Sequence, residues 1–196
     1  MRKTKGESGV RDWQGILRFW FDEIGAKGWY NGGGAVDEAC RSRYLALWEK
    51  ARDGALRDWI IAPRSGLALV ILLDQFPRNM FRGSALSYAT DAQAQATAKW
   101  MLGRNLDAAL EPDARQFIRL PLIHSESLQD QEQGVRRCLL GGAADLDVLH
   151  ARAHREVIRR FGRFPFRNEA LGRRSSRAEA DWLAEGGYQA AVRAVS

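Results

Sequence analysis

The feature that most constrains the fold of this chain is an unbroken run of seven apolar residues, Leu67 to Leu73, which ends at Asp74. A run without a polar face has to be buried on every side, and Pro63 before it suits the first turn of a helix. Pro77 follows closely and is expected to break the regular helical spacing, so that the helix ends near Asp74. Because buried charge must be paired or used, the sequence predicts a polar site inside the protein at this helix end.

The polar residues that follow the run are open to two interpretations. Arg78 lies four residues beyond Asp74, but with Pro77 between them Arg82 or a distant Arg is an equally good partner for the carboxylate. One interpretation is a buried ion pair that fixes a bend in the helix. The other is one wall of a ligand pocket.

Composition narrows the class of protein. The chain has 196 residues, 45% of them hydrophobic, and seven Trp, which is typical of a globular protein with a sizeable core. No segment approaches the roughly 20 apolar residues that span a bilayer, and the polar start does not resemble a signal peptide. Two cysteines without a CxxC pair favour a reducing compartment. We therefore expect a soluble, cytoplasmic protein that does not associate with membranes.

Helical periodicity recurs along the chain, and no segment shows the two-residue alternation of a strand. We expect an all-α protein, a compact array of about eight helices without strands. Residues 1–11 are expected to form a flexible tail and residues 12–196 a single helical domain, because the connections are short. Gly162 should close a long helix, and Ser176 with Glu179 should form the capping box of the last one.

A second polar candidate is the segment Arg119–Glu126, in which His124, Ser125 and Glu126 emerge at the end of an apolar helix. A His beside a carboxylate can act as a general base, whereas a satisfied structural His is the plainer interpretation. A nucleophilic role for Ser125 is weak, because adjacent residues on a helix point apart.

The third candidate is the Arg-rich segment from Arg152 to Arg177, which contains nine Arg against two Glu. It could form an anion-binding surface for phosphate, an acidic peptide or nucleic acid, or a solvated helix face. His150 and His154 have the four-residue spacing that many zinc sites use. Without an HExxH signature or a Cys cluster, we expect neither a metal nor another cofactor.

Three motifs together resemble the bacterial family called domain of unknown function 924: LDQFPRNMFRG (73–83), LPLIHSESLQDQ (120–131) and FGRFPFRNEALGRRSS (161–176). The resemblance implies a helical fold similar to tetratricopeptide-repeat arrays and implies no established activity. The recurrent polar positions of the family correspond to Asp74, Gln75, Arg78, Asn79, Arg82, His124, Glu126, His154, Arg163, Arg167, Asn168 and Arg173. The chain departs from the family pattern at Phe166, where a His is usual.

Our leading hypothesis is a site for a small anionic ligand, at which the three motifs converge on one closed pocket. Its candidate ligand-binding residues are Asp74, Arg78, Asn79, Arg82, His124, Glu126, His154, Arg163, Arg167 and Asn168. In this hypothesis the four Arg bind the anion, Asp74 and Glu126 orient them, and His124 moves a proton; these last three are the catalytic candidates.

Three alternatives remain. The first is a non-enzymatic scaffold that presents a groove to a peptide or protein, and the second is a purely structural buried polar network. Nucleic-acid binding ranks last, because most of the Arg residues adjoin apolar family motifs. Residues 76–79 (FPRN) and 164–168 (FPFRN) have similar sequences, and each segment follows the expected end of a helix. We therefore predict that these two segments face each other, with His124 and Glu126 between them and with Asp74 stabilising the arrangement.

Overall fold

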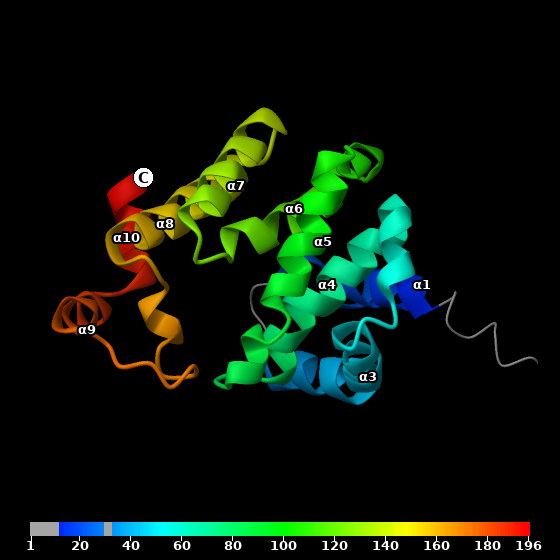
Figure 1. The fold of residues 1–196 in the computed structure, drawn as a ribbon, viewed down its shortest axis with the longest axis horizontal. Helices are drawn as coiled ribbons and strands as arrows, with labels where there is room; N and C mark the ends of the chain where they lie inside the picture. Colours follow the sequence, from blue (N-terminus) through cyan, green and yellow to red (C-terminus); the bar gives the residue numbers. More distant parts are fainter. Residues whose placement is uncertain (1–11, 30–32) are drawn as a thin grey trace, which may run out of the picture.

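The computed structural model describes residues 12–29 and 33–196, which form helices and turns without a strand (Figure 1). This confirms the all-α prediction, while the predicted tail at residues 1–11 lies outside the described residues. The α-helices are α1 (Asp12–Leu17), α2 (Gly25–Trp29), α3 (Gly34–Arg52), α4 (Pro63–Met80), α5 (Asp91–Gly103), α6 (Pro112–Ile123), α7 (Leu128–Leu140), α8 (Asp145–Phe161), α9 (Arg177–Ala184) and α10 (Tyr188–Val195). A π-helical segment, η1 (Arg18–Ile24), follows α1, and the short 3₁₀ segments are η2 (Arg57–Ile61), η3 (Ala85–Tyr88), η4 (Leu106–Ala109) and η5 (Pro165–Arg167).

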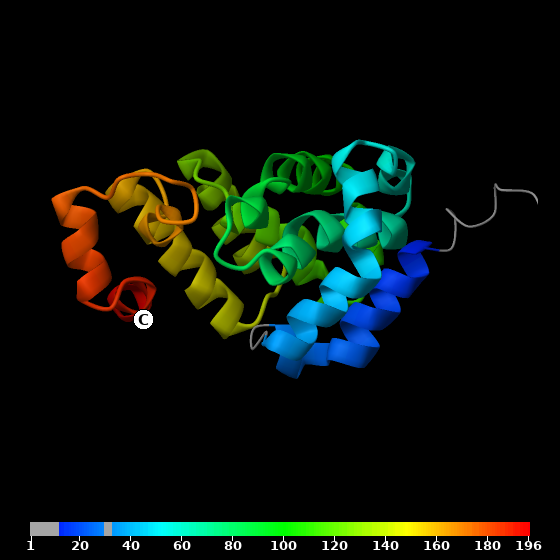
Figure 2. The ribbon, with the colours of Figure 1, turned by 90° about the horizontal axis from the view of Figure 1, so that it is seen from below.

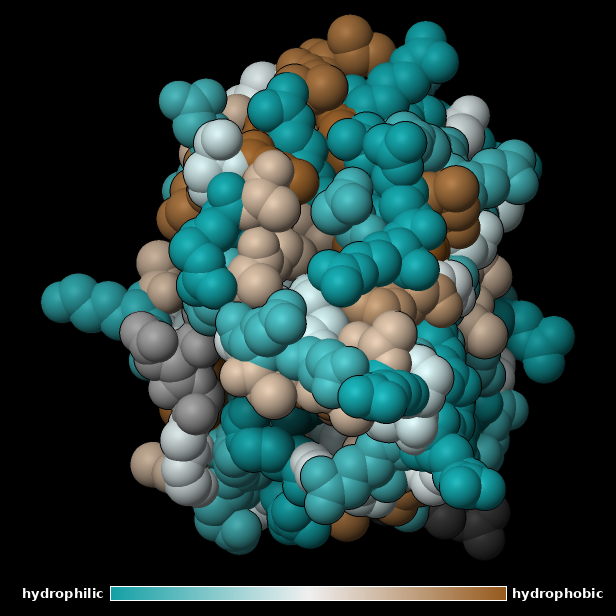
Figure 3. Space-filling model, turned by 90° about the vertical axis from the view of Figure 1, so that its left-hand side faces the viewer, coloured by the Kyte–Doolittle hydropathy of each residue, from teal (hydrophilic) through white to brown (hydrophobic). Residues whose placement is uncertain are grey.

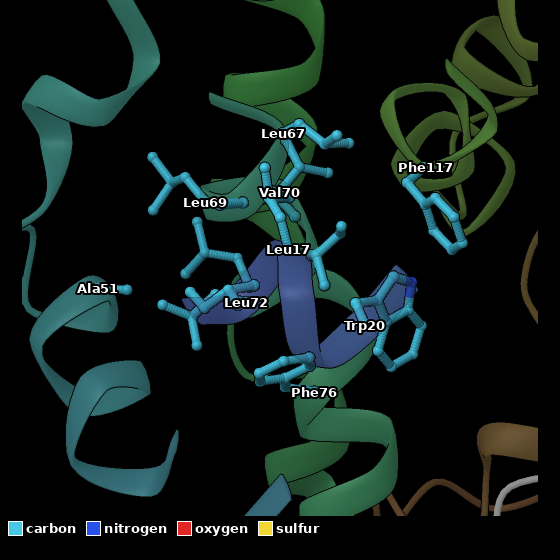
Figure 4. Packing of buried hydrophobic residues seen from close by; sticks show 14 of the residues in the cluster. Leu17, Trp20, Ala51, Leu67, Leu69, Val70, Leu72, Phe76 and Phe117 are labelled. Atoms are coloured by element: carbon cyan, nitrogen blue, oxygen red, sulfur yellow. The ribbon is translucent and has the colours of Figure 1, made fainter. Parts of the chain in front are cut away.

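Helix α4 forms the centre of the larger apolar core. Its residues Leu67 to Leu73 are all buried, as the unbroken apolar run predicts. Leu17, Trp20 and Phe117 from neighbouring elements pack around it (Figure 4). Helices α1, α3, α5 and α6 all contact α4, so a helix without a polar face is covered on every side.

The prediction that Pro77 ends this helix is wrong, because α4 continues through Pro77 to Met80. A proline inside a helix leaves the carbonyl four residues earlier without its N–H donor, and here that carbonyl belongs to Leu73. The hydroxyl of Thr90 donates to the Leu73 carbonyl at 2.6 Å and accepts from Nε1 of Trp48 at 3.2 Å. The Thr90 hydroxyl therefore takes the place of the missing amide, and the helix carries its polar residues one turn further than expected.

The second half of the chain forms a separate apolar cluster. Helices α7 to α10 lie on the left of Figure 1, and α8 packs against both α7 and α10. Ala153, Val157, Phe164 and Trp182 are buried in this smaller core. In Figure 2 the orange and red helices that contribute to it lie on the left, away from the blue helices on the right. The end of the molecule formed by α9 and α10 has a mainly hydrophilic surface (Figure 3).

Two local predictions in this half are confirmed. Gly162 follows α8 with φ of 70°, a left-handed conformation that favours glycine. Ser176 and Glu179 form the expected reciprocal capping box at the start of α9, but α9 is not the last helix, because α10 follows it. From α3 to α8 each helix contacts the next one in sequence, while the likeness to tetratricopeptide-repeat arrays stays a prediction. No helix in the described part of the chain is long and apolar enough to cross a membrane.

Candidate functional site

Asp74 lies at the centre of a buried hydrogen-bond network near the end of α4. Its side chain is 0% exposed and accepts from Nδ1 of His124, which lies 2.9 Å from Oδ1 and 3.0 Å from Oδ2. Nη1 of Arg78 lies 3.3 Å from Oδ1, and Nε2 of Gln75 donates to Oδ2. Because His124 is the C-cap of α6, the network connects the end of α6 to α4.

Asp91, the first residue of α5, joins the two Arg-containing motifs. Arg78 donates from Nη2 to Oδ2 of Asp91 at 3.0 Å, and Arg167 donates from Nη1 to the same oxygen at 3.2 Å. Nη2 of Arg167 also donates to the carbonyl of His124 at 3.0 Å. Arg78 and Arg167, distant in sequence, thus share one carboxylate that no motif contained.

Burial and charge set the protonation states of the central pair. Burial raises the pKa of the Asp74 carboxyl, but the charge of Arg78 and the hydrogen bonds from His124 and Gln75 outweigh it and hold the pKa well below its usual range. Burial lowers the pKa of His124, and the charges of Arg78 and Arg167 lower it further, whereas the charge of Asp74 raises it. At neutral pH we therefore assign a carboxylate to Asp74 and a neutral imidazole to His124. Its Nδ1–H donates to Asp74, which leaves the lone pair on Nε2.

A cavity of about 250 Å³ lies beside this network, and we call it the cationic cavity. Its lining residues are Arg78, Arg82, Gly83, Ser87, Tyr88, His124, His154, Phe166 and Arg167. All of its described charged lining residues are arginines, whereas Asp74 and Asp91 are not among the lining residues. The guanidinium of Arg167 lies 4.6 Å from the ring centre of Tyr88, so a cation and an aromatic ring contact each other in the cavity lining.

Arg82 is the most exposed of these three cations. It forms a two-point ion pair with Asp37 at 2.9 Å, and its side chain is 57% exposed. Arg82 also donates to Oδ1 of Asn79, while Nδ2 of Asn79 donates to the carbonyl of Gln75. Asn79 therefore supports the helix end and does not line the cavity.

Two further candidates, Glu126 of the second motif and Arg163 of the third, form ion pairs outside the cavity. Glu126 accepts from Arg173 at 2.7 and 2.9 Å and from the backbone N–H of Phe164 at 2.9 Å. Arg163 pairs with Glu179 at 2.6 Å. These contacts close the loop between α8 and α9.

Asn168 also belongs outside the cavity, since its Nδ2 donates to Ser175 at 3.1 Å. The structure therefore does not place Glu126, Arg163 or Asn168 among the residues that line the cationic cavity.

His154 lies next to His124, with ring centres 6.1 Å apart. Its Nδ1 lies 2.8 Å from the carbonyl of His150 and 3.0 Å from the hydroxyl of Tyr188. A carbonyl only accepts, so Nδ1 of His154 carries the proton. Burial, with the nearby His124 acting in the same direction, lowers the pKa of His154 to about 3. Within residues 12–29 and 33–196, no group of three or more His, Cys, Asp or Glu side chains could hold a metal ion.

Comparison with known proteins identifies the family of this chain. A family model described as "Bacterial protein of unknown function (DUF924)" matches residues 16–187. The chain belongs to this family. It is also similar to a solved structure of a protein of unknown function from Agrobacterium tumefaciens, at 35% identity and a TM-score of 0.85, covering 90% of this chain and 98% of the other. No functionally curated protein matches.

Sequence reasoning missed several residues of the cationic site in this family member. Ser87, Tyr88 and Asp91 lie outside all three motifs. One feature of the sequence indicated that residues were missing from the site. The candidate residues include four Arg but only two acids, so buried Arg side chains would need further carboxylates as partners. The structure supplies them as Asp37, Asp91 and Glu179.

Proposed function

We propose that this protein binds a small anion in the cationic cavity and that His124 takes up a proton when the anion binds. The observation that carries the proposal is that the cavity's described charged lining residues are all arginines, and none of their carboxylate partners lines the cavity. Such a wall creates a positive potential inside a concave, partly desolvated space. Guanidinium groups offer paired N–H donors that match carboxylate, sulfate or phosphate oxygens.

Arg167 supports the proposal further. It is 6% exposed, and its Nε is buried without a hydrogen-bond partner among the described residues. Burial, with the charge of Arg78 acting in the same direction, lowers the pKa of Arg167. An anion beside both guanidiniums would relieve this repulsion and supply the missing acceptor.

The proton uptake follows from the same charges. Arg78 and Arg167 both lower the pKa of His124, and an anion that neutralises them would raise it. The hydrogen bond to Asp74 holds the Nδ1 tautomer, so the incoming proton would bind Nε2.

The burial of the guanidiniums favours this proposal over the open peptide-binding scaffold. Arg78 and Arg167 bind Asp91, and Arg173 binds Glu126, with little of these side chains left to face a long groove.

Isothermal titration calorimetry with inorganic sulfate, which stays a dianion between pH 5.5 and pH 7, tests the binding step. Arg82→Met should raise the Kd for sulfate about tenfold, the loss of one charge-assisted contact. Arg43→Met is the matched control, because Arg43 forms a similar exposed ion pair with Glu23 and does not line the cavity. Equal sulfate affinity in the two variants would contradict the proposal and leave the structural network as the better interpretation.

The proton step has its own readout. Sulfate should bind more tightly as the pH falls from 7 to 5.5, because protonated His124 is stabilised by the bound anion. His124→Gln should remove most of this pH dependence. If His124→Gln keeps the full pH dependence, the proton is taken up elsewhere.

A further inference from the structure

A second cavity, of about 390 Å³, lies between α6 and α8, and we call it the apolar cavity. Leu120 and Ile123 of α6 line one side, and Ala143 and Leu146 line the side near the start of α8. A volume of this size is within the range of small-molecule sites in proteins. Its hydrocarbon wall would bind the apolar part of a ligand.

One end of this cavity has polar groups that already satisfy one another. The hydroxyl of Tyr188 lies 2.8 Å from Nδ1 of His150 and 3.0 Å from Nδ1 of His154. His124 and His154 also line the cationic cavity, so these two imidazoles separate the two spaces. This end therefore offers no unpaired charge to a ligand.

Arg119 also lines this cavity and forms no ion pair among the described residues, although Asp147 is near enough for the two charges to attract each other. The backbone position of Arg119 in α6 is about 7.5 Å along the helix from that of His124, at 1.5 Å per residue. Arg119 is 5% exposed, and its Nε is buried without a partner. Nη2 donates to the carbonyl of Gly141 at 3.2 Å, and no carboxylate in the described part of the chain lies within 4.0 Å of the guanidinium nitrogens. A buried cation without an anionic partner is costly unless a ligand completes it.

Gly141 and Asp147 are two neighbours of Arg119 that bear on what can bind beside it. A Cβ atom at position 141 would collide with the guanidinium, so Gly141 leaves the room that Arg119 occupies. Asp147 is the acid that lines the cavity among the described residues, and it lies outside ion-pair distance of Arg119. Its charge disfavours a ligand with a second carboxylate, since like charges repel.

We propose that the apolar cavity binds an apolar monocarboxylate, an aromatic or branched carboxylic acid whose carboxylate pairs with Arg119. The hydrocarbon group then contacts Leu120, Ile123 and Leu146. Arg119 also lines an adjoining polar cavity of about 350 Å³ with Arg136 and Arg137, where a free inorganic anion could reach it. The apolar lining favours the organic acid, and the experiment separates the two.

Calorimetric titration with phenylacetate, against benzyl alcohol as the uncharged probe of similar size, tests the chemistry. We expect phenylacetate to bind at least about tenfold more tightly than benzyl alcohol, because a desolvated ion pair contributes more than a neutral contact. Equal affinities, or displacement of phenylacetate by sulfate in the wild-type protein, would overturn the assignment.

The location is tested with a pair of matched variants. Leu146→Trp should fill the mouth of the cavity and weaken phenylacetate binding about tenfold or more. Leu139→Trp is the control, because Leu139 is comparably exposed (52% against 62% for Leu146) and does not line this cavity. Both positions are exposed, so the result does not depend on removing the buried Arg119, which could unfold the chain.

The outcome also separates this inference from the proposed function. If phenylacetate binding is lost in Arg82→Met but kept in Leu146→Trp, the acid occupies the cationic cavity and the apolar cavity is not its site. If Leu146→Trp abolishes phenylacetate binding while sulfate binding is unchanged, the two sites are independent and the inference holds.

Discussion

The continuation of α4 through Pro77 predicts a measurable coupling between Pro77 and Thr90. Thr90→Val keeps a β-branched side chain but removes the hydroxyl that donates to the Leu73 carbonyl and accepts from Trp48. Thr90 and Trp48 are each 1% exposed, so water cannot replace either bond. A buried polar group left without a partner costs about 1–3 kcal/mol, so the substitution should lower the free energy of unfolding by about 2–4 kcal/mol.

The same change should cost less when residue 77 has an N–H. In a Pro77→Ala background, the amide of Ala at this position can donate to the Leu73 carbonyl, which removes one of the two losses. The cost of Thr90→Val should then fall by about 1–2 kcal/mol, which is the expected coupling energy of the cycle. The effect of proline on the unfolded chain appears in both arms of the cycle and cancels.

Urea denaturation of the four proteins, followed by circular dichroism, gives this coupling energy directly. Circular dichroism is preferred because Trp48, which takes part in the bond, would bias fluorescence. A coupling energy within about 0.3–0.5 kcal/mol of zero, the range of independent sites, would refute the idea that the Thr90 hydroxyl replaces the proline amide.

Three further predictions concern the polar groups. Asp74→Asn should lower the free energy of unfolding by about 3–5 kcal/mol, because it removes the buried carboxylate that Arg78 and His124 contact, whereas Asp37→Asn in an exposed pair should cost about 0–1 kcal/mol; urea denaturation compares them. The lowered pKa of Asp74 means that its contribution is present above about pH 4 and lost as the pH falls further, so Asp74→Asn should flatten the acid limb of the stability profile. Burial lowers the pKa of His154 to about 3, so the unfolded chain takes up a proton first; stability should fall by about 2 kcal/mol between pH 8 and pH 5, and His154→Gln should remove this loss. Ser176→Ala should cost about 1 kcal/mol and increase hydrogen exchange in the first turn of α9, through loss of the capping box.

Local chemistry explains what the sequence could predict. The apolar run of α4, the left-handed Gly162 and the capping box at Ser176 each depend on residues close together in the chain. Their periodicity and cap preferences act within one or two turns, so a single sequence contains the information. The ion pair of Arg78 with Asp74 is also local, but the sequence left Arg82 or a distant Arg equally possible because the helix was expected to end near Asp74.

Hydrogen bonds and ion pairs between residues far apart in the chain explain what the sequence could not predict. The rule that proline ends a helix failed at Pro77 because Thr90, 13 positions further on, supplies the missing donor. Asp91 was missed for the same reason: its partners Arg78 and Arg167 come from two distant motifs. An excess of Arg showed that more acids were required, but only the packing of α5 against α4 identifies which one.

The departure at Phe166 bears on where a proton can be held in the cationic cavity. Phe166 lines that cavity and stacks on Phe164 with ring centres 5.2 Å apart, so the aromatic surface at this position is kept while any titratable group is absent. Two imidazoles still line the cavity, those of His124 and His154. His154 donates to a backbone carbonyl, which cannot stabilise an imidazolium as a charged carboxylate does, whereas His124 is bonded to Asp74. The proton uptake in the proposed function is therefore assigned to His124, and the substitution at position 166 is compatible with it because residue 166 contributes shape and not charge.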